Sequence, residues 1–126
     1  MESLFVPGIM VMLFAFLLTS CNSEEVYEKI TGKWDCVSWT SEAHADNQCF
    51  GRDVYFVFND DRTYKSKLGA EIDSGTFNIS GRNLTVNPIN KLDINVEILR
   101  LTQDSLSFLM NAGGIEEKML FEKVTN

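Results

Sequence analysis

The sequence predicts an all-β domain that folds as an eight-stranded antiparallel up-and-down barrel. Turn-forming residues divide residues 32–124 into eight short pieces, about one every 12 residues, which is the strand spacing of sandwiches and barrels. Nothing after residue 30 repeats with a helical period. All connections but one are short, which predicts antiparallel neighbours in chain order. Closing such a meander into a barrel removes its two exposed edges, and a sandwich is the alternative.

The strands are predicted from the alternation of apolar and polar side chains. The clearest alternation covers residues 92–98 and shifts its phase at Leu99, which predicts a β-bulge. Turns are predicted at residues 59–62 and 80–83, and a corner at residues 68–73. In chain order, the predicted strands are residues 32–40, 52–58, 63–68, 74–79, 84–86, 92–98, 106–110 and 117–124.

Residues 1–20 are predicted to be a cleaved signal peptide. They contain 14 apolar side chains and a single charged residue, and residues 9–18 form an unbroken apolar run. That run has the length of a signal-peptide hydrophobic region, whereas a membrane-spanning helix needs about 20 residues. Residues 18–21, Leu-Thr-Ser-Cys, resemble the bacterial lipobox, which implies that the Cys21 thiol receives diacylglycerol. An ordinary signal peptide or an uncleaved anchor, with Cys21 incidental, is the alternative.

Residues 21–30 are predicted to be a lipidated tether and a short helical turn. Several acyl chains on Cys21 would anchor the protein stably to a membrane, where one chain would be marginal. No aspartate directly follows Cys21, and the acidic residues Glu24 and Glu25 come soon after it. This pattern resembles lipoproteins sent to the outer membrane. The expected localisation is therefore the outer membrane, lipid-anchored, on its periplasmic face or at the cell surface.

Charge limits the partners that the domain is expected to bind. The whole chain carries 18 acidic and 11 basic residues, a net charge of −7. Nucleic acid and anionic lipid both require a basic face, so neither is an expected electrostatic partner.

Five short motifs follow one another in the order and spacing of a known family. They are residues 30–34, Ile-Thr-Gly-Lys-Trp, then residues 56–64, 74–79 and 99–106, and a closing 121–124, Phe-Glu-Lys-Val. Together they resemble the lipocalin-like lipoproteins of Bacteroidetes. The resemblance implies that residues 31–126 are a lipocalin-like β-barrel domain.

The resemblance also implies how one end of the barrel is closed. In this family the tryptophan of Gly-x-Trp plugs the closed end, and a basic residue of the last strand lies over it. Trp34 and Lys123 occupy these positions, and a cation over an indole face is a favourable contact. The family usually has Asp-Gly in the hairpin where this chain has Asp61 and Arg62.

The barrel interior is the expected ligand site. An eight-stranded barrel is either just filled by its side chains or able to hold one small ligand. Both a filled core and an apolar ligand cavity therefore remain possible from the sequence. Ile98 and Phe121 are expected on the inward face. The candidates for the cavity lining are Trp39, Phe56, Phe58, Tyr64, Phe77 and Phe108.

The longest connection, residues 41–50, lies where lipocalins have a lid loop. It contains His44 near three other potential metal ligands, but their spacing matches no metal signature, so no metal site is expected. Cys36 and Cys49 are either a disulfide or two buried thiols. A disulfide here would stabilise the fold by roughly 3 kcal/mol.

No catalytic motif appears in the sequence, so neither an enzyme nor a cofactor is expected. The predicted function is an outer-membrane-anchored lipoprotein that binds a small apolar or amphipathic ligand. The alternative is a non-enzymatic interaction or inhibitor lipoprotein of the envelope with a filled core. The sequence does not identify a protein partner.

Overall fold

The structure, a computed structural model, describes residues 22–125. The predicted signal peptide and Cys21 lie outside the described residues. Within the part that is described, no helix is long and apolar enough to cross a membrane.

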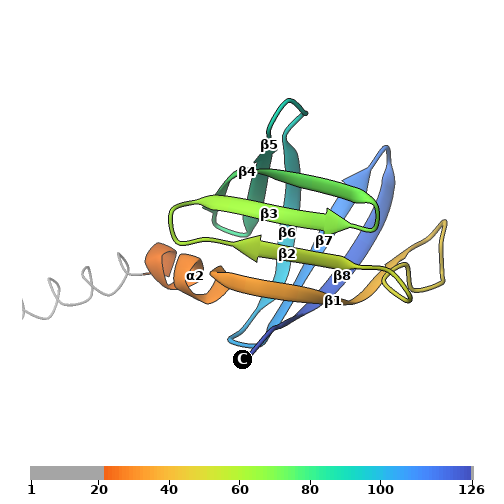
Figure 1. The fold of residues 1–126 in the computed structure, drawn as a ribbon, viewed down its shortest axis with the longest axis horizontal. Helices are drawn as coiled ribbons and strands as arrows, with labels where there is room; N and C mark the ends of the chain where they lie inside the picture. The colour runs from red at the N-terminus through yellow and green to blue at the C-terminus, as the bar shows by residue number, and fades with distance from the viewer. Residues whose placement is uncertain (1–21, 126) are drawn as a thin grey trace, which may run out of the picture.

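One helix and eight strands make up the described fold (Figure 1). Each strand pairs antiparallel with its neighbours in chain order, and β8 returns to pair with β1. This closed barrel confirms the predicted fold class. The elements are α2 (Asn22–Ile30), β1 (Gly32–Ser41), β2 (Val54–Phe58), β3 (Thr63–Leu68), β4 (Glu71–Ser80), β5 (Asn83–Pro88), β6 (Ile94–Leu101), β7 (Ser105–Ala112) and β8 (Ile115–Lys123).

Several strand boundaries differ from the prediction. Leu68 pairs with Glu71, so the expected corner at residues 68–73 is a tight turn and β4 begins earlier. The pairing of β5 with β6 ends at Ile94, and Leu92 lies in the connection before it, 89% exposed. The alternation of apolar and polar residues in the sequence begins at Leu92, but the pairing of β6 with β5 begins only at Ile94, so the predicted strand starts two residues too early.

Two bulges interrupt the sheet. The predicted one lies in β6 between Ile98 and Arg100, where the register with β7 shifts, and it is confirmed. A second bulge, not predicted, lies in β1 between Cys36 and Ser38. The bulge shifts the inward-facing positions of β1 by one residue. Cys36 pairs with Phe121 before the bulge, and Trp39 pairs with Met119 after it.

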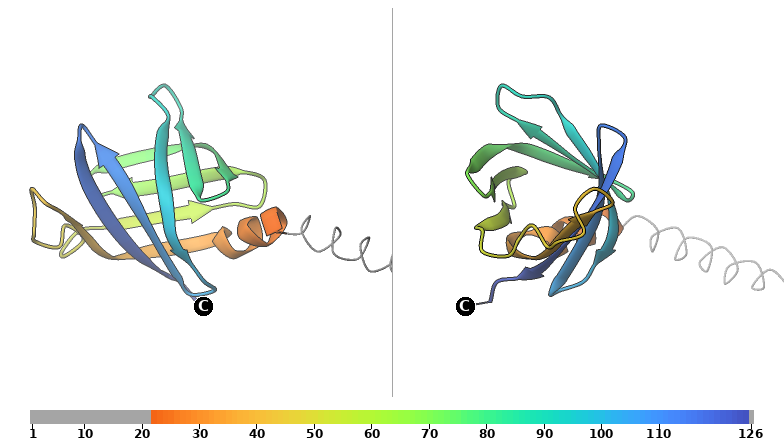
Figure 2. Two further views of the ribbon diagram at one scale, coloured as in Figure 1. Left: turned by 180° about the vertical axis from the view of Figure 1, so that it is seen from behind. Right: turned by 90° about the vertical axis from the view of Figure 1, so that its right-hand side faces the viewer.

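Helix α2 covers one end of the barrel (Figure 2). Its first turn holds Glu24 and Glu25 and its last turn holds Lys29, the charge order that suits the helix dipole. Ile30 is fully buried in the core. The helix is longer than the short turn expected from the sequence because Tyr27 also packs against the core.

Tyr27 fastens α2 to β4. Its hydroxyl accepts a hydrogen bond from the Ile79 backbone N–H at 2.8 Å and lies 3.0 Å from Asn78 Oδ1, to which it donates. Its ring lies 6.0 Å from that of Phe77. On its other side, the Arg62 guanidinium carbon is 3.2 Å from the ring centroid. Helix, sheet and the β2–β3 turn therefore meet at one side chain.

Trp34 and Lys123 meet at the same end of the barrel. Trp34 is fully buried, and its Nε1 donates a hydrogen bond to the Ile30 carbonyl at 2.8 Å. Lys123 Nζ lies 5.1 Å from the centroid of the Trp34 ring and donates to the Lys29 carbonyl at 3.1 Å. Gly32 permits this approach, because a Cβ there would meet the Lys123 side chain at 3.0 Å. Together these contacts close the end that α2 covers.

Candidate functional site

The candidate site is an apolar cavity at the end of the barrel opposite α2. In an up-and-down barrel alternate connections share an end, so the β1–β2, β3–β4, β5–β6 and β7–β8 connections surround this opening (Figure 1). Leu68, Ile94 and Met110 line the cavity, and each stands close to one of these connections. The cavity has a volume of about 50 Å³.

Aromatic side chains form the floor of the cavity and fill the barrel beneath it. Phe56, Tyr64 and Phe108 belong to the cavity wall. The Phe56 ring lies 5.8 Å from that of Phe108 and 5.5 Å from that of Phe58, which is nearer to α2. Phe58 and Phe77, with rings 4.9 Å apart, are buried there. Among the described residues, the interior is therefore packed with side chains near α2, and the cavity lies toward the mouth.

Aliphatic and methionine side chains make up most of the remaining wall. They come from inward-facing positions of strands β3, β5, β6, β7 and β8, where residues separated by two share a face. These wall residues are Leu68, Leu84, Val86, Ile94, Val96, Met110 and Met119.

Three polar groups interrupt this apolar wall on strands β3 and β4. Ser66 is buried, and Asp73 opposes it in the register between the strands. Burial raises the pKa of the Tyr64 phenol, and the nearby Asp73 carboxylate raises this pKa further. The phenol is protonated at neutral pH, as an ordinary tyrosine is, and can donate a hydrogen bond.

An ion-pair network lies beside these polar groups at the mouth. Lys91 Nζ, from the β5–β6 connection, is 2.6 Å from an Asp73 oxygen and 3.2 Å from a Glu71 oxygen. Hydrogen bonds to Asp73 and then to Glu71 raise the pKa of Lys91. Two carboxylates thus face one ammonium group, which leaves a net negative charge at this side of the opening.

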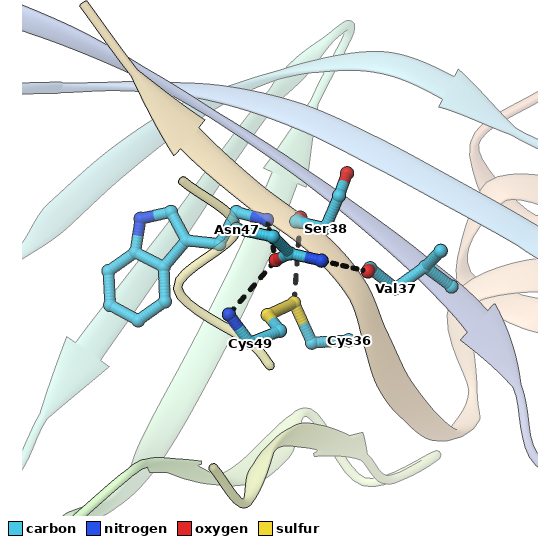
Figure 3. The surroundings of a disulfide bond; sticks show 6 residues. Cys36, Val37, Ser38, Asn47 and Cys49 are labelled. Atoms are coloured by element: carbon cyan, nitrogen blue, oxygen red, sulfur yellow. Dashed lines mark hydrogen bonds between the residues drawn. A yellow bond between two sulfur atoms is a disulfide. The ribbon is translucent and has the colours of Figure 1, made fainter. Parts of the chain in front are cut away.

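The long connection after β1 is fastened at two points beside the mouth (Figure 3). Cys36 and Cys49 form a disulfide, with their Cα atoms 6.0 Å apart. Asn47 Nδ2 donates to the Val37 carbonyl at 2.8 Å, and its Oδ1 accepts the Trp39 and Cys49 backbone N–H groups, each at 3.0 Å. The connection therefore occupies the edge of β1 that β2 is too short to reach.

The predicted site residues fall into three groups. Phe56, Tyr64 and Phe108 line the cavity, whereas Phe58 and Phe77 pack below it in the core. Trp39 is half-buried against the core, outside the cavity wall. His44 lies in the long connection and is exposed, and the described residues contain no group of three potential metal ligands.

Sequence reasoning did not place Ser66 or Asp73 in the site. Ser66 carried a usable signal, because it lies between Tyr64 and Leu68 on one face of a predicted strand. Asp73 carried none, because it was expected in a corner rather than in β4.

Comparison with known proteins agrees with this architecture. A family model described as a lipocalin-like domain matches residues 30–108, which is more than half of the chain. No curated protein matches the chain. The closed eight-stranded barrel and the family match together show that the chain belongs to the lipocalin-like domain family.

Proposed function

We propose that this protein binds a small amphipathic molecule, whose apolar end enters the cavity at the mouth of the barrel. The observation that carries this proposal is the open, apolar cavity at one end of an otherwise filled lipocalin-like barrel. Concave apolar sites with a few convergent polar groups are typical of small-molecule binding.

The size of the cavity limits what can enter. A cavity needs about 10–15 Å³ for each water-sized group that it holds, so a cavity of about 50 Å³ has room for roughly three to five such groups. A whole drug-sized ligand would need several hundred Å³. The bound part is therefore the tip of a single acyl chain or a small ring, and the rest of the ligand lies at the mouth.

The polar groups of the wall orient such a ligand. The Tyr64 and Ser66 hydroxyls and the Asp73 carboxylate are all on the β3–β4 side, whereas the β5–β8 side is apolar. A ligand with a polar group near its apolar tip would place that group toward β3 and β4. The bound state needs no catalytic group, and the proposed activity is binding without chemistry.

Displacement of a fluorescent fatty acid tests the binding proposal. Val86 lines the cavity and is buried, so Val86→Phe fills the space and should weaken binding about tenfold or more. Val37→Phe makes the same change on the outer face of β1, where Val37 is exposed, and should leave affinity unchanged. Equal affinities for the wild type and both variants, measured on folded protein, would contradict the proposal.

We also propose that the protein is a lipoprotein of the outer membrane, anchored by acyl chains on Cys21. The lipobox-like residues 18–21 after an apolar run support this proposal. Cys21→Ala should abolish metabolic labelling with palmitate and leave an unprocessed precursor on a gel. Persistent labelling of that variant would contradict the anchoring proposal and leave the binding proposal untouched.

A further inference from the structure

Large exposed apolar side chains gather around the mouth of the barrel. Phe50 and Leu92 are 87% and 89% exposed. Both lie in connections at the open end, in β1–β2 and β5–β6 respectively. We define the apolar rim as five exposed residues on the connections and strand ends at this opening: Phe50, Ile72, Leu92, Ile94 and Ile115.

The rim is concentrated at one end of the molecule. Among the described residues, three other large apolar side chains are exposed, and they lie elsewhere. Val37 is in β1, Ile89 lines a groove on the outer face of β3–β5 with Thr63 and Asn87, and Leu99 shares a groove with Val26 of α2. Apolar residues scattered singly over a surface need no explanation, but a group of them at one opening indicates a binding surface.

The rim continues into the cavity. Ile94 belongs to both, because it lines the cavity and is 39% exposed. It pairs with Val86, another cavity residue. An apolar chain leaving the cavity would therefore pass along apolar side chains and not through a polar ring.

Charge at the rim distinguishes between possible occupants. The two longer connections at this end, residues 42–53 and 89–93, carry four acidic and two basic side chains. A second copy of the chain would bring two acidic rims together, which like-charge repulsion opposes. An anionic lipid surface would be repelled in the same way. A zwitterionic or uncharged lipid surface meets no such penalty and accepts isolated apolar side chains from loop tips.

We infer that the apolar rim docks on a zwitterionic lipid surface, from which the apolar end of a ligand enters the cavity. This inference rests on the proposed function for the direction of ligand transfer, but the docking itself is a separate property. The connections that carry the rim lie away from α2 (Figure 2). The rim is therefore a different surface from any anchor that precedes α2.

The test is the depth of a fluorophore on the rim. In the full chain with Cys21→Ser, Leu92→Cys is labelled with nitrobenzoxadiazole, and Leu99→Cys carries the same label beside α2, away from the mouth, as the control. Phosphatidylcholine vesicles should shift the emission of the label at position 92 to the blue and raise it about twofold, as expected for entry into a lipid interface. The label at position 99 should not respond. The N-terminal segment is present in both variants and could bind vesicles by itself. Association of the protein with vesicles is therefore not evidence for docking by the rim.

A second variant tests the cooperation of rim residues. Phe50→Ser in the Leu92→Cys background should reduce the response about tenfold at limiting lipid, because a large apolar side chain is lost from the interface. Equal responses at positions 92 and 99, or none at either, would overturn the inference. So would a stronger response to phosphatidylglycerol than to phosphatidylcholine. A response of position 92 to protein concentration without lipid would assign the rim to a second copy and overturn it too.

The outcomes separate this inference from the proposed function. If the wild type binds the fluorescent fatty acid and Val86→Phe does not, while the label at position 92 stays in water, only the docking inference fails. If the label enters the vesicle and no fatty acid binds, only the proposed ligand binding fails.

Discussion

At the scale of single residues, Lys123 performs two tasks at the closed end of the barrel. Its ammonium group lies over the Trp34 ring and also donates to the last turn of α2 through the Lys29 carbonyl. A neutral side chain of similar length would keep the packing of its methylene groups but lose both polar contacts.

Lys123→Met should therefore lower the free energy of unfolding by about 2 kcal/mol, the low end of the sum expected for a cation–π contact and one charged hydrogen bond, because the hydrogen bond is exposed. Lys33→Met is the matched control, because Lys33 Nζ lies 4.6 Å from the Tyr55 ring but closes no end of the barrel. Urea denaturation measures both. Equal losses for the two variants would show that Lys123 has no special role at the closed end.

Arg62 adopts a backbone conformation in the β2–β3 turn that is strained for any residue except glycine. Its φ is 70°, in the left-handed region that glycine adopts more easily. The stacking of its guanidinium group on Tyr27 offsets this strain. Arg62 thus adopts a backbone conformation that suits glycine, and its side chain adds a contact with α2.

Arg62→Ala should destabilise the fold by about 0.5–1 kcal/mol, because it loses the stacking and keeps the strain. Arg62→Gly should be close to the wild type, because relief of about 1 kcal/mol of strain compensates for the lost contact. Thermal denaturation of the wild type and the two variants measures the order of their stabilities. A glycine variant less stable than the alanine variant would contradict this account.

At the scale of elements, the β1–β2 connection completes the sheet edge where β2 ends. Pairing between β1 and β2 stops at Asp35 and Tyr55, and the rest of β1 receives Asn47 and the backbone of Gln48. The disulfide ties the same connection to β1 at the bulge. The connection is therefore a fixed wall of the mouth.

Replacing both Cys36 and Cys49 by alanine should lower the stability by about 3 kcal/mol, because the crosslink closes a short loop. Hydrogen exchange should quicken in residues 42–53, while β4 and β5 exchange in step with global unfolding. Unchanged protection of residues 42–53 in the double variant would show that Asn47 alone fixes the connection.

The sequence predicted the element order better than the site, for a physical reason. Alternation identifies which face of a strand turns inward, and it placed Phe56, Phe58 and Tyr64 on the inward face correctly. Alternation does not show where a residue lies along the barrel axis. It therefore could not distinguish residues of the cavity wall from core residues below the cavity. Strand ends such as Ile94 depend on where the partner strand stops, which no local pattern contains.

At the scale of the whole molecule, the mouth combines polar groups whose pKa values are raised on folding. For Tyr64 the cause is mainly burial, and for Lys91 it is hydrogen bonding to Asp73 and Glu71. In both cases the folded state binds the proton more tightly than the unfolded state. The stability they contribute is complete below their ordinary pKa values of 10.0 and 10.5 and is lost as the pH rises through their folded values.

The free energy of unfolding should therefore fall as the pH is raised above about 10. Tyr64→Phe should flatten part of this dependence, because it removes one of the titrating groups. Urea denaturation at a series of alkaline pH values measures the slope. An identical slope in the wild type and the variant would show that Tyr64 does not contribute.

The central claim is that a ligand's apolar end occupies the cavity at the mouth. Two methionines of the cavity wall, Met110 and Met119, report on it directly, because the methyl group of each can be labelled with carbon-13. The account predicts nuclear Overhauser contacts between the terminal methyl group of a bound medium-chain fatty acid and both methionine methyl groups. Saturating fatty acid that gives no contact with either methyl group, and leaves both resonances unshifted, would contradict it.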